Sequence, residues 1–367
     1  MGVRIEGNSL VFSFENVHKD AGCSVNFQRT LRIPDDENTY ALPPGLGNFP
    51  IQAVEEFANA PSKFKEHGGF MFPMYQSEAM WMSFNNYNGY PIALKIAAGS
   101  INAVDGNTIE DGLNSNGEQD YCAIPGQPWL DGFCVEKGKI RQFIAMPLGG
   151  GFTAEEQITG ESHFGGLQFI AYALKKEKWD EICQHRDVLR CASTKGGAFA
   201  SPGVSPYITD YSEVYACATS SMDMLDCVGM ESAAMGFGAG GAMKQDIYKD
   251  DYTIDDYDLD NPVVCHVNLC NSEAWSQITG AMPPYPAPTA QDYSRARLPW
   301  FDYYSEKHAV DGSATLAGVK SVNEILLDQG ADPLPNNEPV TPGMVVTKID
   351  PDIQYPGVVV PAYKAQA

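Results

Sequence analysis

Four carboxylates are the side chains of this sequence best suited to catalysis. Glu78 lies in the stretch SEAMW and Glu273 in the similar stretch SEAW, while Asp120 and Asp131 lie within EQDYCAIPGQPWLDGF. Two carboxylates that face one cleft can act as general acid and general base. If the protein is an enzyme, these acids therefore predict a hydrolase or a carbohydrate-active enzyme. The structural alternative is that each glutamate satisfies a backbone or arginine partner beside a buried tryptophan.

A run of aspartates between residues 246 and 260 suggests a second kind of site. Hard oxygen ligands on a loop suit calcium, although the residue order of an EF-hand, with its central glycine, is missing. The alternatives are a solvated acidic loop or a weak divalent-cation site, whose ligands would be Asp250, Asp251, Asp255, Asp256 and Asp258. Calcium is the one cofactor that the sequence suggests.

The stretch GFGAGG matches the G-x-G-x-x-G pattern of dinucleotide-binding proteins, through Gly236, Gly238 and Gly241. That fingerprint needs a strand before the glycines and an acidic residue after the next strand. Here the preceding segment is a poor strand, and the acidic run comes before the next strand, where it would repel a pyrophosphate. We therefore interpret the glycines as a structural loop that permits positive φ or close backbone packing.

Landmarks in the two parts of the chain recur in the same order. A G-x-G stretch is followed about 30 residues later by Ser-Glu-Ala and a tryptophan, and the interval from that serine to a Tyr-Pro pair is 13 residues in both parts. This pattern predicts a diverged internal duplication. The structural residues that would correspond are Gly45, Gly47 and Trp81 in the first part and Gly238, Gly240 and Trp275 in the second.

The elements expected around these residues are mainly strands. Period-2 alternation predicts a hairpin over 8–33. Further strands are expected at 91–99, 139–148, 165–174 and VVCHVNLC, and 165–174 is apolar on both faces, as in a central buried strand. Helical spacing predicts helices over 51–60, 175–190, much of 212–232 and 318–330.

Together these elements predict a β-rich α+β fold of two related half-domains, whose mainly antiparallel sheets are flanked by helices. The expected divisions are an N-terminal half-domain at 1–195, a linker at 196–210, a C-terminal half-domain at 211–330 and a proline-rich extended arm at 331–367.

Several of these stretches resemble a widespread, uncharacterised family of bacterial and fungal proteins. They are LPPGLGNFP, MYQSEAMW, IPGQPWLDGF, IRQFIAMPLGGG, GFGAGGAMKQDIY and LPWFDYY, and the resemblance spans roughly residues 29–325. Members are often labelled integral membrane proteins, although this chain has no apolar run long enough for a membrane-spanning helix. The resemblance implies no activity, cofactor or catalytic residue.

Charge and cysteine content restrict the partners and the compartment. The chain has 367 residues, with Lys+Arg 24 against Asp+Glu 47, which gives a net charge of −23. Such a field repels phosphate backbones and anionic lipids, so we expect neither nucleic-acid binding nor membrane insertion. Nine scattered cysteines are typical of free thiols in a reducing compartment, either the cytoplasm or an organelle interior.

The leading functional hypothesis from the sequence is a non-catalytic structural protein that associates with itself into a tube, sheet or shell. Duplicated surfaces and terminal extensions can propagate contacts between copies of a homo-oligomer. The arm residues expected to make these contacts are Tyr355, Val358, Val359, Val360 and Tyr363. The hydrolase and the divalent-cation-binding module are the alternatives.

Overall fold

Strands dominate the structure, as the alternating apolar residues predict. The computed structural model describes residues 2–86, 88–114, 118–193, 233–305 and 307–349. In these ranges sixteen strands belong to one sheet. They are β1 (Gly2–Glu6), β2 (Ser9–Ser13), β3 (Gly22–Thr30), β4 (Thr39–Tyr40), β5 (Gln52–Ala53), β6 (Phe70–Met74), β7 (Ala79–Asn85), β8 (Ile92–Ala98), β9 (Ile101–Asn102), β10 (Cys122–Ile124), β11 (Trp129–Leu130), β12 (Gly132–Glu136), β13 (Lys139–Pro147), β14 (Leu167–Ala173), β15 (Ala234–Lys244) and β16 (Val263–Asn271).

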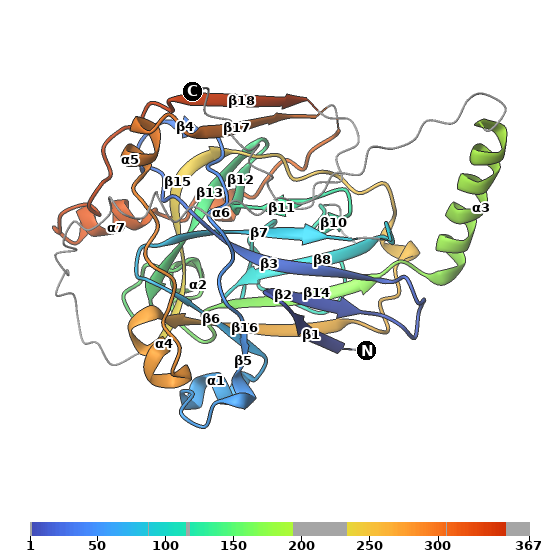
Figure 1. Ribbon diagram of the computed structural model, residues 1–367, viewed down its shortest axis with the longest axis horizontal. Helices are drawn as coiled ribbons and strands as arrows, with labels where there is room; N and C mark the ends of the chain where they lie inside the picture. The colour runs from blue at the N-terminus through green and yellow to red at the C-terminus, as the bar shows by residue number, and fades with distance from the viewer. Residues whose placement is uncertain (1, 87, 115–117, 194–232, 306, 350–367) are drawn as a thin grey trace, which may run out of the picture.

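The sheet is largely antiparallel, as predicted. Its main path runs β1-β2-β3-β7-β13-β15-β16-β14-β8-β10. Parallel pairing occurs where β4 joins β15 and where β6 joins β16. A separate parallel ribbon consists of β17 (Pro299–Tyr304) and β18 (Met344–Ile349). It lies along the upper edge of the molecule in Figure 1.

Strands from the two predicted half-domains, 1–195 and 211–330, pair within one sheet, and the division into related half-domains stays a prediction. In the sheet, β15 pairs with β13, and β16 pairs with both β14 and β6, so strands from before and after the expected linker alternate. The strands before and after residues 196–210 are therefore joined by backbone hydrogen bonds, although the turn-rich composition of these residues suggested a boundary there. The linker itself and the helix expected within 212–232 lie outside the described residues.

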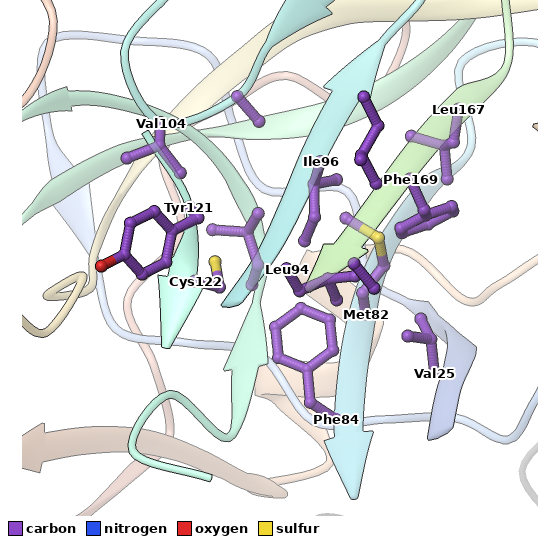
Figure 2. Close-up of a cluster of buried hydrophobic side chains, with 14 of the residues drawn as sticks. Val25, Met82, Phe84, Leu94, Ile96, Val104, Tyr121, Cys122, Leu167 and Phe169 are labelled. Atoms are coloured by element: carbon purple, nitrogen blue, oxygen red, sulfur yellow. The ribbon is translucent and has the colours of Figure 1, made fainter. Parts of the chain in front are cut away.

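The main core fills the space between two layers of this folded sheet. Phe12 on β2 packs edge-on against Phe169 on β14, with ring centroids 6.0 Å apart. Phe27 on β3 stacks on Phe72 of β6 at 4.6 Å. Figure 2 shows the same arrangement beside these rings, where side chains from β3 and β7 face those from β8 and β14. Those labelled in the figure include Val25, Met82, Phe84, Leu94, Ile96 and Leu167.

The glycine-rich stretch is a buried strand, β15, and our interpretation of it as a loop is wrong. A Cβ atom at Gly238 would lie 2.6 Å from the carbonyl oxygen of Phe152, and one at Gly241 would lie 2.1 Å from that of Pro34. A Cβ at Gly240 would come within 2.5 Å of Ile144. The glycines thus allow neighbouring segments to approach the strand backbone closely, which is the packing role inferred from the sequence.

Helices are few and short in the described residues. They are α1 (Ser62–His67), α2 (Ala154–Thr159), α3 (Lys176–Ser193), α4 (Ser272–Thr279), α5 (Ala290–Arg295), α6 (Ala314–Ala317) and α7 (Val322–Asp328). The long helix expected near 175–190 is α3, which extends away from the sheet in Figure 1, whereas the helix expected over 51–60 is reduced to a 3-10 turn at Val54–Glu56. None of the helices in these ranges is both long and apolar enough to cross a membrane.

The two Ser-Glu-Ala stretches adopt different secondary structures. Trp81 lies on strand β7, whereas Trp275 lies on helix α4. Ser77 has a φ of 65° and turns the chain into β7, while Asn271 caps the first turn of α4 by accepting a hydrogen bond from the backbone N–H of Glu273. Both tryptophans are buried core residues. The structure of these residues therefore does not confirm the expected duplication.

Residues 331–349, the described part of the predicted arm, pack against the rest of the chain. Leu334 and Val340 are buried, and Asn337 exchanges hydrogen bonds with Asp35. This part of the tail packs against its own chain and ends in β18. The expected contact residues Tyr355, Val358, Val359, Val360 and Tyr363 lie outside the described residues.

Candidate acidic ligand groove

Three loops enclose a groove of about 340 Å³ at one end of the sheet. The first loop connects β9 to β10, the second follows β15, and the third precedes α6. Its charged lining residues are Asp105, Glu118, Asp250 and Asp311, with Lys249 as the basic one. We call this feature the acidic groove. Its volume falls within the range of known small-molecule sites.

Asp250 is held in the wall of the acidic groove by two tyrosines. Its Oδ2 accepts hydrogen bonds from the hydroxyls of Tyr121 at 2.9 Å and Tyr257 at 2.7 Å. Its Oδ1 accepts one from the backbone N–H of Tyr252 at 3.1 Å. Burial raises the pKa of Asp250 above its usual range, and these hydrogen bonds oppose the shift. Burial, with the charge of Asp250 added, also raises the pKa of both tyrosines, so their hydroxyls stay protonated and donate.

Gln119 links the first and second loops of the acidic groove by hydrogen bonds. Its amide donates to the carbonyl oxygens of Tyr121 at 2.8 Å and Tyr248 at 3.0 Å, and its Oε1 accepts from the backbone N–H of Asp250 at 2.8 Å. The third loop is linked to the second by a hydrogen bond from the backbone N–H of Val310 to the carbonyl oxygen of Ile247. These hydrogen bonds hold described residues of the three loops together, which reduces the ordering cost of binding.

Asp120, one of the predicted catalytic acids, belongs to the first loop and helps to hold it in place. Its Oδ2 lies 2.8 Å from Nζ of Lys95, and both side chains are 5% exposed. Lys95 also donates to the carbonyl oxygens of Glu110 and Gly112, each at 2.8 Å. The side chain of Asp120 is thus engaged in a buried ion pair that holds the loop in place.

Asp131 lies in a different, fully buried environment. Its Oδ2 accepts a hydrogen bond from the Gln245 amide at 3.0 Å, and its backbone N–H donates to Oε1 of the same residue at 3.0 Å. Burial raises the pKa of Asp131 to about 8, and the bond from Gln245 opposes the shift. The structure does not bring Asp131 together with the other predicted acids, and its contacts are those of a core residue.

Glu78 and Glu273 both act on one side chain, that of Tyr75. The parallel register places Met74 beside Asn271, so Tyr75 lies near the start of α4. Burial raises the pKa of Tyr75, and the charges of Glu78 and Glu273 raise it further. Glu273 is exposed, whereas Glu78 is 8% exposed, and its Oε1 lies 3.8 Å from Nε of Arg29. The environment of Glu78, with an arginine and a backbone N–H as partners, fits the structural alternative.

The aspartates proposed for calcium have separate partners. Asp256 accepts from the backbone N–H and from the hydroxyl of Thr253, and Asp258 accepts from the Asn261 amide. Asp251 and Asp255 are exposed. Across the described ranges, no three His, Cys, Asp or Glu side chains are grouped so that they could hold a metal ion. Calcium at this loop stays a prediction.

Sequence reasoning found Asp250 but missed the residues that surround it. Tyr121 and Gln119 come from a loop about 130 residues earlier, so no spacing in the sequence links them to Asp250. The one sequence signal that could have linked the two segments is that both contain acidic residues and tyrosines. Comparison of the chain with protein-family models, curated proteins and solved structures found no match. The family resemblance therefore stays a prediction as well.

Proposed function

We propose that the protein binds a small organic cation, such as an amine, in the acidic groove. The observation that carries this proposal is a cavity of about 340 Å³ whose lining holds four carboxylates and one lysine. A cleft lined by charge of one sign raises the local concentration of ligands of the opposite sign. The net charge of −23 adds to the same field.

Aromatic side chains favour an organic cation over a bare metal ion. Tyr121 and Tyr252 line the cavity together with the acids. A cation over a tyrosine face gains about 0.5–2 kcal/mol, depending on how far it is desolvated. Metal ions, in contrast, need several oxygen ligands that are free to converge. Both oxygens of Asp250 already accept hydrogen bonds, and those of Asp105 accept from Asn107.

Titration calorimetry with three probes tests this proposal. We expect 1,4-diaminobutane to bind saturably at low salt and more weakly at high salt, because screening reduces exposed charge interactions. The variant Glu118→Gln/Asp311→Asn removes two exposed carboxylates of the groove, and we expect a loss of at least about threefold in affinity. A variant that neutralises exposed acids on other loops, Glu15→Gln/Glu37→Gln, is the charge-matched control.

The other two probes distinguish the alternatives. Binding of Ca²⁺ without the diamine would favour the divalent-cation module. Binding of a neutral monosaccharide alone would favour a carbohydrate-active protein. Absence of saturable diamine binding at low salt, or equal losses in both double variants, would refute the proposal.

A second candidate function is self-association, and the β17–β18 ribbon favours it. Met344 and Val345 on β18 are 42% and 46% exposed. Within the described residues β18 pairs only on its β17 side, so its other edge is open to a further strand. An exposed apolar edge strand is a common route to β-sheet contacts between copies.

Electron microscopy and light scattering on the full-length chain test this second candidate. We expect ordered assemblies or concentration-dependent oligomers that Met344→Ser/Val345→Ser weakens. A chain ending at Ile349 tests the contribution of the residues beyond β18 and keeps Leu334 and Val340 in place. A monodisperse monomer at high concentration, with and without divalent salt, would exclude self-association.

A further inference from the structure

The segment Met282–Pro288 has a sequence that favours one extended conformation. In MPPYPAP every residue is either a proline or precedes one. Proline fixes its own φ near −65°, and it shifts the preceding residue toward the extended region. Residues 282–289 have neither helical nor strand structure and link α4 to α5 along the outside of the molecule (Figure 1). We call residues 282–288 the proline segment, and its sequence favours a polyproline II helix.

Two buried charged residues hold the inner side of the proline segment. The guanidinium of Arg29 donates a hydrogen bond to the carbonyl oxygen of Tyr285. The backbone N–H of Ala287 faces the carboxylate of Glu78 and opposes the rise in its pKa that burial causes. The side chains of Arg29 and Glu78 are only 7% and 6% exposed, so both anchors lie beneath the segment. The segment is therefore fixed to the sheet through its backbone and leaves its side chains available.

The outer side of the segment presents large apolar side chains. Polyproline II has three residues per turn, so positions 282, 285 and 288 follow one edge. Met282 is 84% exposed and Tyr285 is 78% exposed, the two highest values among the exposed large apolar side chains of the described residues. The intervening prolines are half-buried. An exposed tyrosine and methionine on a fixed backbone lose little conformational freedom on binding.

Charge distinguishes the proline segment from the rest of this acidic chain. No charged residue occurs between Glu273 and Asp292, although these two acids flank it. An uncharged apolar ridge of this kind is complementary to an aromatic-lined groove.

We propose that the proline segment is a docking site for a partner protein whose aromatic-lined groove binds polyproline II helices, as SH3, WW and EVH1 domains do. Pro283 and Pro286 provide the three-residue proline spacing, and Tyr285 and Met282 provide the contacts that protrude. The anchors on Arg29 and Glu78 hold the segment in its bound conformation before the partner arrives. This site is separate from the acidic groove and does not depend on the ligand proposed there.

Interferometry with the immobilised full-length protein tests the proposal against purified SH3, WW and EVH1 domains. We expect saturable binding of at least one domain class. Met282→Ser/Tyr285→Ser should weaken it at least about tenfold, which corresponds to roughly 1.4 kcal/mol. Leu327→Ser removes another exposed apolar side chain, on α7, and should leave binding unchanged. Circular dichroism checks that each variant remains folded.

Three outcomes would overturn the proposal. The first is that no domain class binds saturably. The second is that binding does not change in Met282→Ser/Tyr285→Ser. The third is that this double variant abolishes an oligomer of the protein itself while no domain binds, which would make the segment a contact between copies of the chain.

Discussion

Replacing Asp131 by asparagine should remove a large pH-dependent cost from the folded protein. The aspartate is 3% exposed, and its side chain accepts a hydrogen bond from the neutral amide of Gln245. Its pKa rises from the ordinary value of 3.8 to about 8 because burial disfavours the charged form. Between these two values the folded protein holds the proton and the unfolded chain does not.

The magnitude follows from proton linkage. A raised native pKa gives stability that is fully present below pH 3.8 and is lost as the pH rises toward about 8. Within this window the free energy of unfolding falls by about 1.4 kcal/mol per pH unit. From pH 5 to pH 7 the contribution of Asp131 therefore falls by about 2.7 kcal/mol. The amide that replaces the carboxyl group cannot titrate, so Asp131→Asn should gain that amount relative to the natural chain over the same interval.

Urea unfolding followed by tryptophan fluorescence at pH 5, 6, 7 and 8 measures this difference. The quantity to compare is the change in unfolding free energy with pH, because the amide group of asparagine adds a cost to folding that does not depend on pH. The variant Asp332→Asn, which makes the same charge change at an exposed position, is the control. A difference between Asp131→Asn and the natural chain that stays constant from pH 5 to pH 7 would refute the reasoning, since Asp131 would then be ionised in the folded protein.

Three further predictions concern single contacts, and chemical denaturation measures each of them. Lys95→Met should destabilise the fold by about 3–5 kcal/mol because it leaves the buried carboxylate of Asp120 without its cation, and adding Asp120→Asn should recover part of this loss. Gly241→Ala should reduce soluble yield or lower the midpoint strongly, because its Cβ would lie 2.1 Å from the carbonyl oxygen of Pro34; an unchanged midpoint would contradict the close packing of β15. Thr153→Ala should cost about 1 kcal/mol through loss of the N-cap of α2, and Thr153→Ser should restore most of it.

Periodicity predicted the parts of the fold in which apolar residues alternate with polar ones. The hairpin of β2 and β3 follows directly from Leu10, Phe12 and Phe14, which all lie in the core. Strands β8, β13, β14 and β16 were also predicted, β14 because its sequence is apolar on both faces. The strand β15 was missed, because glycine and alanine carry no apolar period even where the backbone is buried.

The acidic groove could be predicted only in part, because its residues come from distant segments. The acidic run that contains Asp250 was visible, and carboxylates were expected to matter. Its partner Tyr121 could not be identified, since only the pairing of β15 with the rest of the sheet brings the two loops together. Similarly, the joint effect of Glu78 and Glu273 on Tyr75 depends on the parallel register of β6 and β16, which no spacing in the sequence reveals.

The interleaving of early and late strands has a consequence for synthesis of the chain. Thr39 on β4 pairs with Ala242 on β15, 203 residues later (242 − 39). On a ribosome, β4 and β13 would emerge long before the strand that lies beside them, with their edges open and their apolar faces uncovered. Contacts between residues so far apart in sequence also slow folding, because the intervening loop must close first. The nascent chain should therefore depend on chaperones until β15 and β16 have left the exit tunnel.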